Sequence, residues 1–174
     1  MPCLITCALN WNLNARRGCA SIRSRGAAKS RANITERFSG AIERWLDAGH
    51  GACILRRHDC AEIVAEALRY FDAQRALMIS SVVMPNHVHA VFVQHPSWPL
   101  EKLLRSWKSF TSRKINQQLS REGTLWERDY FDRLVRDQKH FANCVRYIRR
   151  NPERAGLRSG EYILYESELA RSVE

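Results

Sequence analysis

Residues 84–93 read MPNHVHAVFV, a Pro-Asn turn signal followed by an apolar run that carries two histidines. Successive side chains of a strand point to opposite faces, so His87 and His89 share one face. The run is apolar on both faces beyond the histidines, which predicts a strand covered on both sides. With the β-branched strand expected over 77–84, it predicts a hairpin with both imidazoles just past the turn. Such a pair can begin a divalent metal site, although histidines with only a structural role share this spacing.

Length and composition describe one ordinary globular domain. The chain has 174 residues, of which 45% are hydrophobic and 26% charged, and this is enough for one core. No apolar run approaches the roughly 20 residues that a membrane helix needs, and no basic region precedes the mildly apolar N-terminus. We therefore expect a cytoplasmic protein without membrane contact. The six cysteines show no tight paired spacing, which favours reduced thiols over a disulfide framework.

The net charge of +10 is unevenly distributed along the chain. Residues 1–35 carry six Lys/Arg and no Asp/Glu, and residues 102–154 carry fourteen against six. The two remaining segments each have a net charge of −2. Clustered basic residues are typical of a protein with a polyanionic partner, nucleic acid first. A solvated basic surface is the alternative.

The N-terminal part of the chain has little pattern. Residues 5–11 could form a strand, whereas residues 12–33 are rich in Arg, Ser, Ala, Gly and Asn and have no apolar period. They are expected to be a loop or a disordered basic arm. We therefore divide the chain into a basic arm over 1–33, one domain over 34–160 and a C-terminal tail over 161–174.

Helical spacing of apolar residues predicts the helices of the domain. These segments are 34–48, 59–75, 100–118 and 139–150. Asp59 with Glu62 three residues later resembles a capping box at the start of the second helix. Short strands are expected at 52–55 and within 125–133.

The helix expected over 100–118 has an apolar stripe, with Phe110 as a member, and an opposite face of basic and hydroxyl-bearing residues. This face suits contacts to phosphate, which fix position rather than read sequence. The expected contacts are Lys102, Arg105, Lys108 and Arg113. A solvated helix face is the alternative.

The helix expected over 139–150 carries Tyr147 at the edge of a buried stripe, and Asn151 follows four residues later on the same side. Neighbouring arginines are expected to contact DNA; these are Arg146, Arg149 and Arg150. Pro152 is expected to break the helix, so Asn151 either caps the turn that follows or joins a metal site.

A tyrosine phenol has a pKa near 10 and is a poor nucleophile at neutral pH. It becomes useful when the target is a phosphodiester whose developing charge is offset by a divalent cation. His87 and His89 would hold that cation, and Tyr147 would attack phosphorus. A half-buried packing tyrosine is the alternative reading of Tyr147.

The runs VMPNHVH at 83–89 and YIRRNPERAGL at 147–157 closely resemble the REP-associated tyrosine transposases, which are insertion-sequence-200-like single-tyrosine transposases. The segment LWERDYFD at 125–132 is similar to the aromatic segment between the two motifs in that family. The resemblance covers roughly residues 36–157. A His-x-His pair alone is weak, but the three segments in this order are highly specific.

This resemblance implies an α+β fold of the HUH nuclease class, with a ferredoxin-like antiparallel sheet and helices packed on one face. It implies His87 and His89 as ligands of Mg²⁺ or Mn²⁺, Asn151 as a further candidate ligand and Tyr147 as the nucleophile. The implied substrate is single-stranded DNA, often beside a small hairpin. The implied intermediate is a 5′-phosphotyrosine, formed without a nucleotide cofactor. Relatives include monomers and homodimers, so both states stay open.

One departure from the family concerns its central first strand, whose pattern residues 1–33 do not show. An altered or displaced N-terminus would lower stability and make this copy less active or inactive. The main rival is a DNA-hairpin-binding protein that keeps the fold without the chemistry. A structural zinc module is a weaker rival, because convincing third and fourth ligands are missing. Trp126 and Tyr130 could stack on unpaired bases, with core packing as the alternative.

Overall fold

The computed structural model describes the backbone of residues 5–12, and residues 46, 48–128 and 130–174 in full. The helix expected over 34–48 lies outside the described residues except near its end, where Leu46 is buried. The greater part of the expected basic arm also lies outside them.

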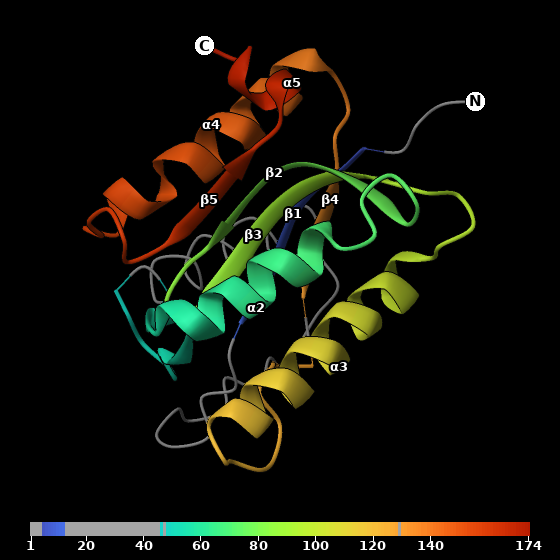
Figure 1. Ribbon diagram of the computed structural model, residues 1–174. Helices are drawn as coiled ribbons and strands as arrows, with labels where there is room; N and C mark the ends of the chain where they lie inside the picture. The colour runs from blue at the N-terminus through green and yellow to red at the C-terminus, as the bar shows by residue number, and fades with distance from the viewer. Residues whose placement is uncertain (1–4, 13–45, 47, 129) are drawn as a thin grey trace, which may run out of the picture.

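The core of the fold is a five-stranded sheet in the order β4-β1-β3-β2-β5, and every neighbouring pair is antiparallel (Figure 1). The strands are β1 Ile5–Asn12, β2 Ala76–Val83, β3 His87–Gln94, β4 Phe131–Leu134 and β5 Ile163–Glu166. The order of the first four is that of a ferredoxin-like sheet. The predicted α+β fold with a ferredoxin-like antiparallel sheet is therefore confirmed.

The predicted hairpin is formed by β2 and β3. Val83 pairs with Val88, and the Met84 N–H donates to the His87 carbonyl at 2.8 Å to close the turn. Strand β3 has β1 on one side and β2 on the other. Its backbone is therefore held by two ladders, which fixes the positions of the histidines at its start.

Strand β1 corrects the expectation of a displaced N-terminus. It pairs with β3 so that Asn10 lies opposite His89 and Asn12 opposite His87. Ladder hydrogen bonds join main-chain groups, so a segment without clear apolar alternation can still fill a central place. The predicted strand over 5–11 is present, and the reason for expecting lower stability or lost activity is removed.

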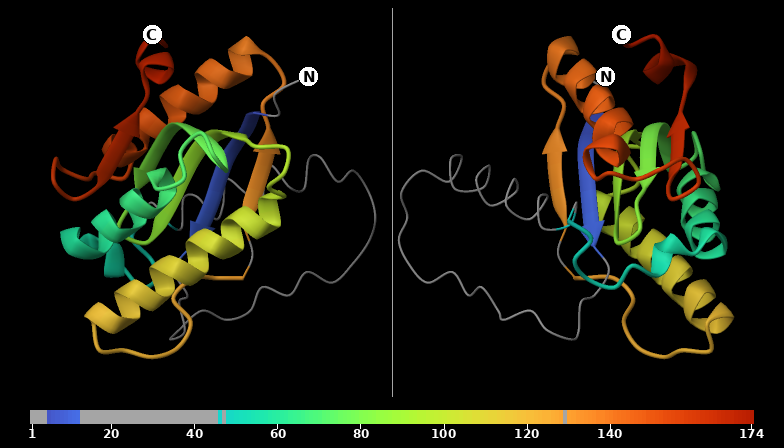
Figure 2. Two further views of the ribbon diagram at one scale, coloured as in Figure 1. Left: turned by 45° about the vertical axis from the view of Figure 1, so that its right-hand side comes forward. Right: turned by 90° about the vertical axis from the view of Figure 1, so that its left-hand side faces the viewer.

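Helices cover both faces of the sheet (Figure 2). Helices α2 His58–Arg69 and α3 Leu100–Gln118 pack on the face that includes Val88, Ala90 and Phe92. Helix α4 Gln138–Arg154 packs on the opposite face, which includes Val91. Helices α2 and α3 lie on one face of the sheet, as predicted. Helix α4 forms an additional layer on the other face. Among the described residues, no helix is long and apolar enough to cross a membrane.

Two local predictions before β2 are wrong. The strand expected over 52–55 is replaced by the short 3₁₀ helix η1 Ile54–Arg56, because a four-residue apolar run does not distinguish a strand from a helical turn. Helix α2 starts before Asp59 and ends at Arg69 rather than near 75. Asp59 therefore lies inside the first turn, where it accepts from the Cys60 N–H at 2.9 Å, and no capping box forms.

Helix α3 has its predicted bounds, but one member of its buried stripe is different. Phe110 is 39% exposed, whereas Thr111 is buried. The Thr111 hydroxyl accepts from the Trp126 indole N–H at 2.8 Å and donates to the Trp107 carbonyl. Trp126 is 3% exposed and Tyr130 packs partly buried against the same core. Core packing, rather than base stacking, describes these two aromatics.

Helix α4 does not break before Pro152. It continues to Arg154, and the Ala155 N–H donates to the Asn151 carbonyl at 3.0 Å. A proline lacks the N–H that would donate to the carbonyl four residues earlier, so α4 loses one hydrogen bond at Pro152. Asn151 therefore lies within the helix and does not cap a following turn.

The segment 161–174, expected as a tail, contains β5 and the short helix α5 Glu168–Arg171. Strand β5 extends the sheet by pairing with β2, with Glu166 opposite Ser80. The pattern of this segment is mixed because β5 is an edge strand and is only partly buried.

Cysteine spacing gave an incomplete prediction. Cys53 and Cys60 are free thiols, as expected, but Cys144 is disulfide-bonded. Distances along the chain do not show which cysteines the fold brings together, so the expectation of reduced thiols is wrong for Cys144.

Candidate active site

The two histidines of β3 are almost completely buried on the sheet face that α4 covers. His87 is 0% and His89 1% exposed. Their ring centroids lie 4.7 Å apart with the planes nearly perpendicular, at 87°. The alternation of the strand thus places the imidazoles side by side, as predicted.

Helix α4 brings two further predicted residues to this pair. The Tyr147 ring centroid lies 5.3 Å from that of His89, and the Asn151 amide nitrogen lies 3.1 Å from His89 Nε2. Both contacts come from one helix face, since residues four apart are neighbours on a helix. The structure therefore unites His87, His89, Tyr147 and Asn151.

Burial keeps the two imidazoles neutral. It lowers the pKa of His87 to about 4. Burial is the main cause that holds the pKa of His89 well below its usual value, and electrostatic interactions with His87 and Arg154 lower it further. A neutral imidazole has one nitrogen with an available lone pair, which is the form that binds a metal ion.

The two imidazoles and the Asn151 amide form an incomplete set of metal-binding groups, which would leave positions around a bound ion open. Within the described ranges, no third His, Cys, Asp or Glu joins the histidines in a metal-binding group, so a closed zinc site is not formed. The buried atoms His89 Nδ1 and Asn151 Oδ1 have no hydrogen-bond partner among the described residues. Imidazole nitrogens suit several transition-metal ions, whereas an amide oxygen and waters suit Mg²⁺ or Mn²⁺. Turning the Asn151 amide would aim its oxygen toward the His89 ring.

Asn86 belongs to the site but was predicted only as a turn residue. It is 2% exposed, and its Oδ1 lies 2.7 Å from His87 Nδ1. Its amide nitrogen donates to the carbonyls of Leu46 and His50. The position of Asn86 next to a candidate metal ligand could have revealed its role in the sequence. Histidines that bind metals typically donate a hydrogen bond from their second ring nitrogen to a group that orients the ring.

Arg154 is a second residue missing from the predicted site. Its guanidinium carbon lies 5.4 Å from the centre of the Tyr147 ring. It follows Asn151 by three residues, so the helical spacing that selected Asn151 also selects Arg154. Because a helix break was expected at Pro152, Arg154 was not expected to lie on the same helix face as Asn151.

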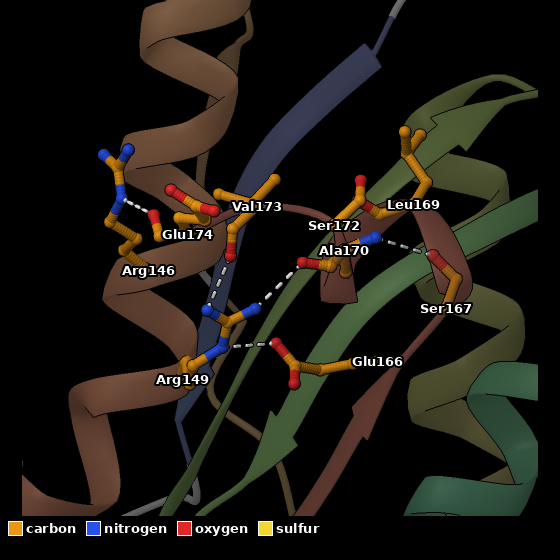
Figure 3. A network of polar contacts seen from close by, with 9 residues as sticks. All are labelled: Arg146, Arg149, Glu166, Ser167, Leu169, Ala170, Ser172, Val173 and Glu174. Atoms are coloured by element: carbon orange, nitrogen blue, oxygen red, sulfur yellow. Dashed lines mark hydrogen bonds and ion pairs between the residues drawn. The ribbon is translucent and has the colours of Figure 1, made fainter.

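Arg149 and Arg146 hold the C-terminal segment, as Figure 3 shows. Arg149 donates to Glu166 Oε1 at 2.9 Å, and to the carbonyls of Val173 at 2.8 Å and Ala170 at 2.9 Å. Arg146 donates to the Glu174 carbonyl and to Asn143 Oδ1. These two guanidinium groups therefore bind the C-terminal segment of the protein itself.

The remaining predicted DNA contacts lie in two separate places. Arg150 is exposed on α4. The predicted contacts on α3, among them Lys102, belong to the helix that packs on the opposite face of the sheet from Tyr147. Lys108 Nζ donates to the Glu127 carbonyl at 2.8 Å, whereas Arg105 and Arg113 are exposed.

Comparison with known proteins agrees with this arrangement. Residues 54–151 match the model of the family described as "Transposase IS200 like". A solved structure of a REP-associated tyrosine transposase bound to a REP hairpin is similar, with a TM-score of 0.51 and 15% sequence identity. The alignment covers 87% of this chain and 68% of that chain. No curated protein matches. At this identity, the structural similarity shows the fold alone.

Proposed function

Because the chain belongs to the IS200-like transposase family, we propose that it cuts and rejoins single-stranded DNA through Tyr147, with Mg²⁺ or Mn²⁺ as cofactor. One observation carries this proposal: α4 places Tyr147 and Asn151 against the buried histidine pair of β3. A tyrosine beside neutral imidazoles and an amide is the set of groups that a metal-assisted attack on phosphorus requires.

The proposed cleavage is a transesterification. The Tyr147 oxygen forms a bond to the phosphorus while the bond from phosphorus to the 3′ oxygen breaks. The phenolic proton is released, and the departing 3′ oxygen takes up a proton from the solvent. The products are a 5′-phosphotyrosine and a free 3′-hydroxyl, with no net oxidation.

His87, His89 and Asn151 would hold the metal ion. When bound, the ion polarises a non-bridging phosphate oxygen and offsets the charge that develops there. Tyr147 lies on the same face of α4 as Asn151, so the helix sets the nucleophile beside the metal-binding groups. The guanidinium of Arg154 lies over the Tyr147 ring and is placed to bind the same phosphate.

Rejoining is the reverse reaction with a different 3′-hydroxyl. That hydroxyl attacks the phosphotyrosine, the bond to the Tyr147 oxygen breaks, and the tyrosine recovers a proton. The ester in the intermediate retains the free energy of the original bond, so no nucleotide cofactor is needed. Exchange of one 3′ end for another is strand transfer.

The substrate that we propose is single-stranded DNA beside a hairpin. The solved relative with the same fold is bound to a REP hairpin. Exposed arginines at two places on this chain, Arg150 on α4 and Arg105 with Arg113 on α3, can contact phosphates.

The test is covalent adduct formation with a labelled hairpin oligonucleotide carrying single-stranded flanks, in Mn²⁺ or Mg²⁺, on a denaturing gel. We expect a protein–DNA adduct that Tyr147→Phe abolishes. Tyr162→Phe is the matched control, because Tyr162 packs partly buried in the same core, and it should keep the adduct. Native-gel binding that is equal in wild type and Tyr147→Phe, without any adduct, would instead identify a hairpin-binding protein.

A further inference from the structure

We propose that Asn86 is a positioning residue that fixes the tautomer of His87 and so makes Nε2 its metal-binding nitrogen. This inference rests on the proposed function for the presence of a metal ion. The tautomer itself follows from hydrogen bonds that the protein makes without any metal.

The orientation of the Asn86 amide is set by its surroundings. One end of the amide lies 2.9 Å from the Leu46 carbonyl oxygen and 2.7 Å from the His50 carbonyl oxygen. Two carbonyls only accept, so this end must be the NH₂ group, which has two hydrogens to donate. The opposite orientation would place three oxygen atoms together in a buried site. The hydrogen-bond network therefore decides which end is oxygen.

The fixed amide then decides where His87 carries its proton. The Asn86 oxygen lies 2.7 Å from His87 Nδ1, and an amide oxygen can only accept. His87 Nδ1 must therefore donate and hold the hydrogen. A neutral imidazole carries hydrogen on only one ring nitrogen, so with Nδ1 as the donor the second nitrogen, Nε2, carries the lone pair.

The turn around Asn86 is itself well held. The Leu55 N–H donates to the Pro85 carbonyl at 3.0 Å, and the Met84 N–H donates to the His87 carbonyl at 2.8 Å. Asn86 is thus a fixed support rather than a mobile loop residue. Groups that orient a ligating histidine through its second nitrogen typically contribute about 10–100-fold in metal affinity.

The first experiment reads the tautomer directly. Wild-type protein with ¹⁵N-labelled histidine is freed of metal with a chelator and studied near pH 7.5 by long-range ¹H–¹⁵N correlation, with His87→Gln used for assignment. We expect His87 with hydrogen on Nδ1 and none on Nε2. A hydrogen on Nε2 would overturn the inference, whatever the protein does with metal.

The second experiment separates positioning from folding. Asn86→Asp keeps an acceptor for His87 Nδ1 but loses both donors, so we expect a lower Tm and Mn²⁺ affinity at least equal to wild type by calorimetry. Asn86→Leu loses both functions and should bind Mn²⁺ about 10–100-fold more weakly. Asn116→Ala is the control, because it removes a comparable bond to the Gly123 carbonyl elsewhere. It should leave Mn²⁺ affinity unchanged.

The outcomes distinguish the inference from the proposed function. Mn²⁺ affinity that falls in step with Tm in all three variants would make Asn86 merely structural and overturn the inference. Hydrogen on His87 Nδ1 in a wild-type protein that binds no Mn²⁺ would refute the metal-dependent function, while the role of Asn86 in setting the tautomer would stand. If Asn86→Leu does not fold, the wild-type tautomer and Asn86→Asp still decide the question.

Discussion

At the scale of a single residue, we predict that Arg154 contributes to the rate of DNA cleavage. Its guanidinium lies over the Tyr147 ring, where it can stabilise negative charge on the attacked phosphate. We expect Arg154→Ala to slow single-turnover adduct formation about 100-fold at saturating DNA, which is the usual effect of losing one group that stabilises transition-state charge. The measurement is the rate of appearance of the adduct on a denaturing gel.

Stability provides the control for this prediction. Arg154 is exposed, so its removal should change the free energy of unfolding by no more than about 0.5 kcal/mol. Arg158→Ala removes an exposed arginine beyond the end of α4 and should leave the adduct rate unchanged. Equal rates for Arg154→Ala and wild type would show that Arg154 does not act on the phosphate.

Some residues of the site could be predicted from the sequence, and others could not. His87 and His89 were recognisable because a spacing of two on a strand always gives one face, and Tyr147 and Asn151 because a spacing of four does so on a helix. The role of Asn86 could not be predicted, because it depends on the carbonyls of Leu46 and His50. The fold brings these two groups to Asn86 from 40 and 36 residues away in the sequence.

At the level of elements, Arg149 joins α4 to the C-terminal segment. It donates three hydrogen bonds, to Glu166, Val173 and Ala170. A lysine cannot span this set, because it lacks the planar fork of a guanidinium. We expect Arg149→Lys to lower the free energy of unfolding by about 2 kcal/mol, which corresponds to about 4–8 °C in Tm for a chain of this size.

Arg150→Lys is the matched control, because Arg150 is the exposed neighbour on the same helix. Thermal unfolding of both variants checks the prediction, and Arg150→Lys should stay within about 0.5 kcal/mol of wild type. An equal, small effect of both substitutions would mean that the C-terminal segment does not hold α4.

A second element-level prediction concerns pH. Asp59 near the start of α2 accepts from Arg57 and from Gln118 at the end of α3. The hydrogen bond from Arg57, followed by that from the Cys60 N–H, holds the pKa of Asp59 below its ordinary value of 3.8. A lowered pKa in the folded state gives stability that is present above the unfolded value and is lost as pH falls through the folded one.

We therefore expect Asp59→Asn to be less stable than wild type at neutral pH, and the difference to shrink as the pH falls below about 4. Urea unfolding at a series of pH values measures it. Arg57→Gln should behave similarly, since it removes the main partner. A difference between wild type and Asp59→Asn that is the same at pH 7 and pH 2 would contradict this account.

The elements with strong periodicity were predicted well, and the others were not. Strands β2 and β3 and helix α3 follow from local apolar patterns within one residue. Strand β5 does not, because an edge strand with partial burial needs little apolar pattern and depends on pairing with β2. Continuation of α4 through Pro152 also depends on tertiary packing, which buries Pro152 and Asn151.

At the scale of the whole molecule, the net charge of +10 makes electrostatic attraction to DNA a general property of the chain. Particular phosphate contacts on α3 would add to this general attraction. Arg105 lines a cavity of about 510 Å³ beside Ser109 and Ser112, and hydroxyl groups next to a guanidinium suit phosphate oxygens. This cavity is on the helix opposite α4, so DNA contacting both would have to pass around an edge of the sheet.

Salt dependence separates a phosphate contact from a solvated charge. If Arg105 contacts a phosphate, Arg105→Ala should reduce the slope of log Kd against log salt by about 0.7 for single-stranded DNA, because one fewer counterion is released. Arg56→Ala is the control: it removes an exposed arginine on η1, in the segment whose acidic residues outnumber its basic ones, and should leave the slope unchanged. Binding is measured by fluorescence anisotropy with Tyr147→Phe as background, so that no covalent adduct forms. Equal slopes for Arg105→Ala and its background would make the α3 face a solvated surface and confine DNA contacts to the side of the molecule that carries α4.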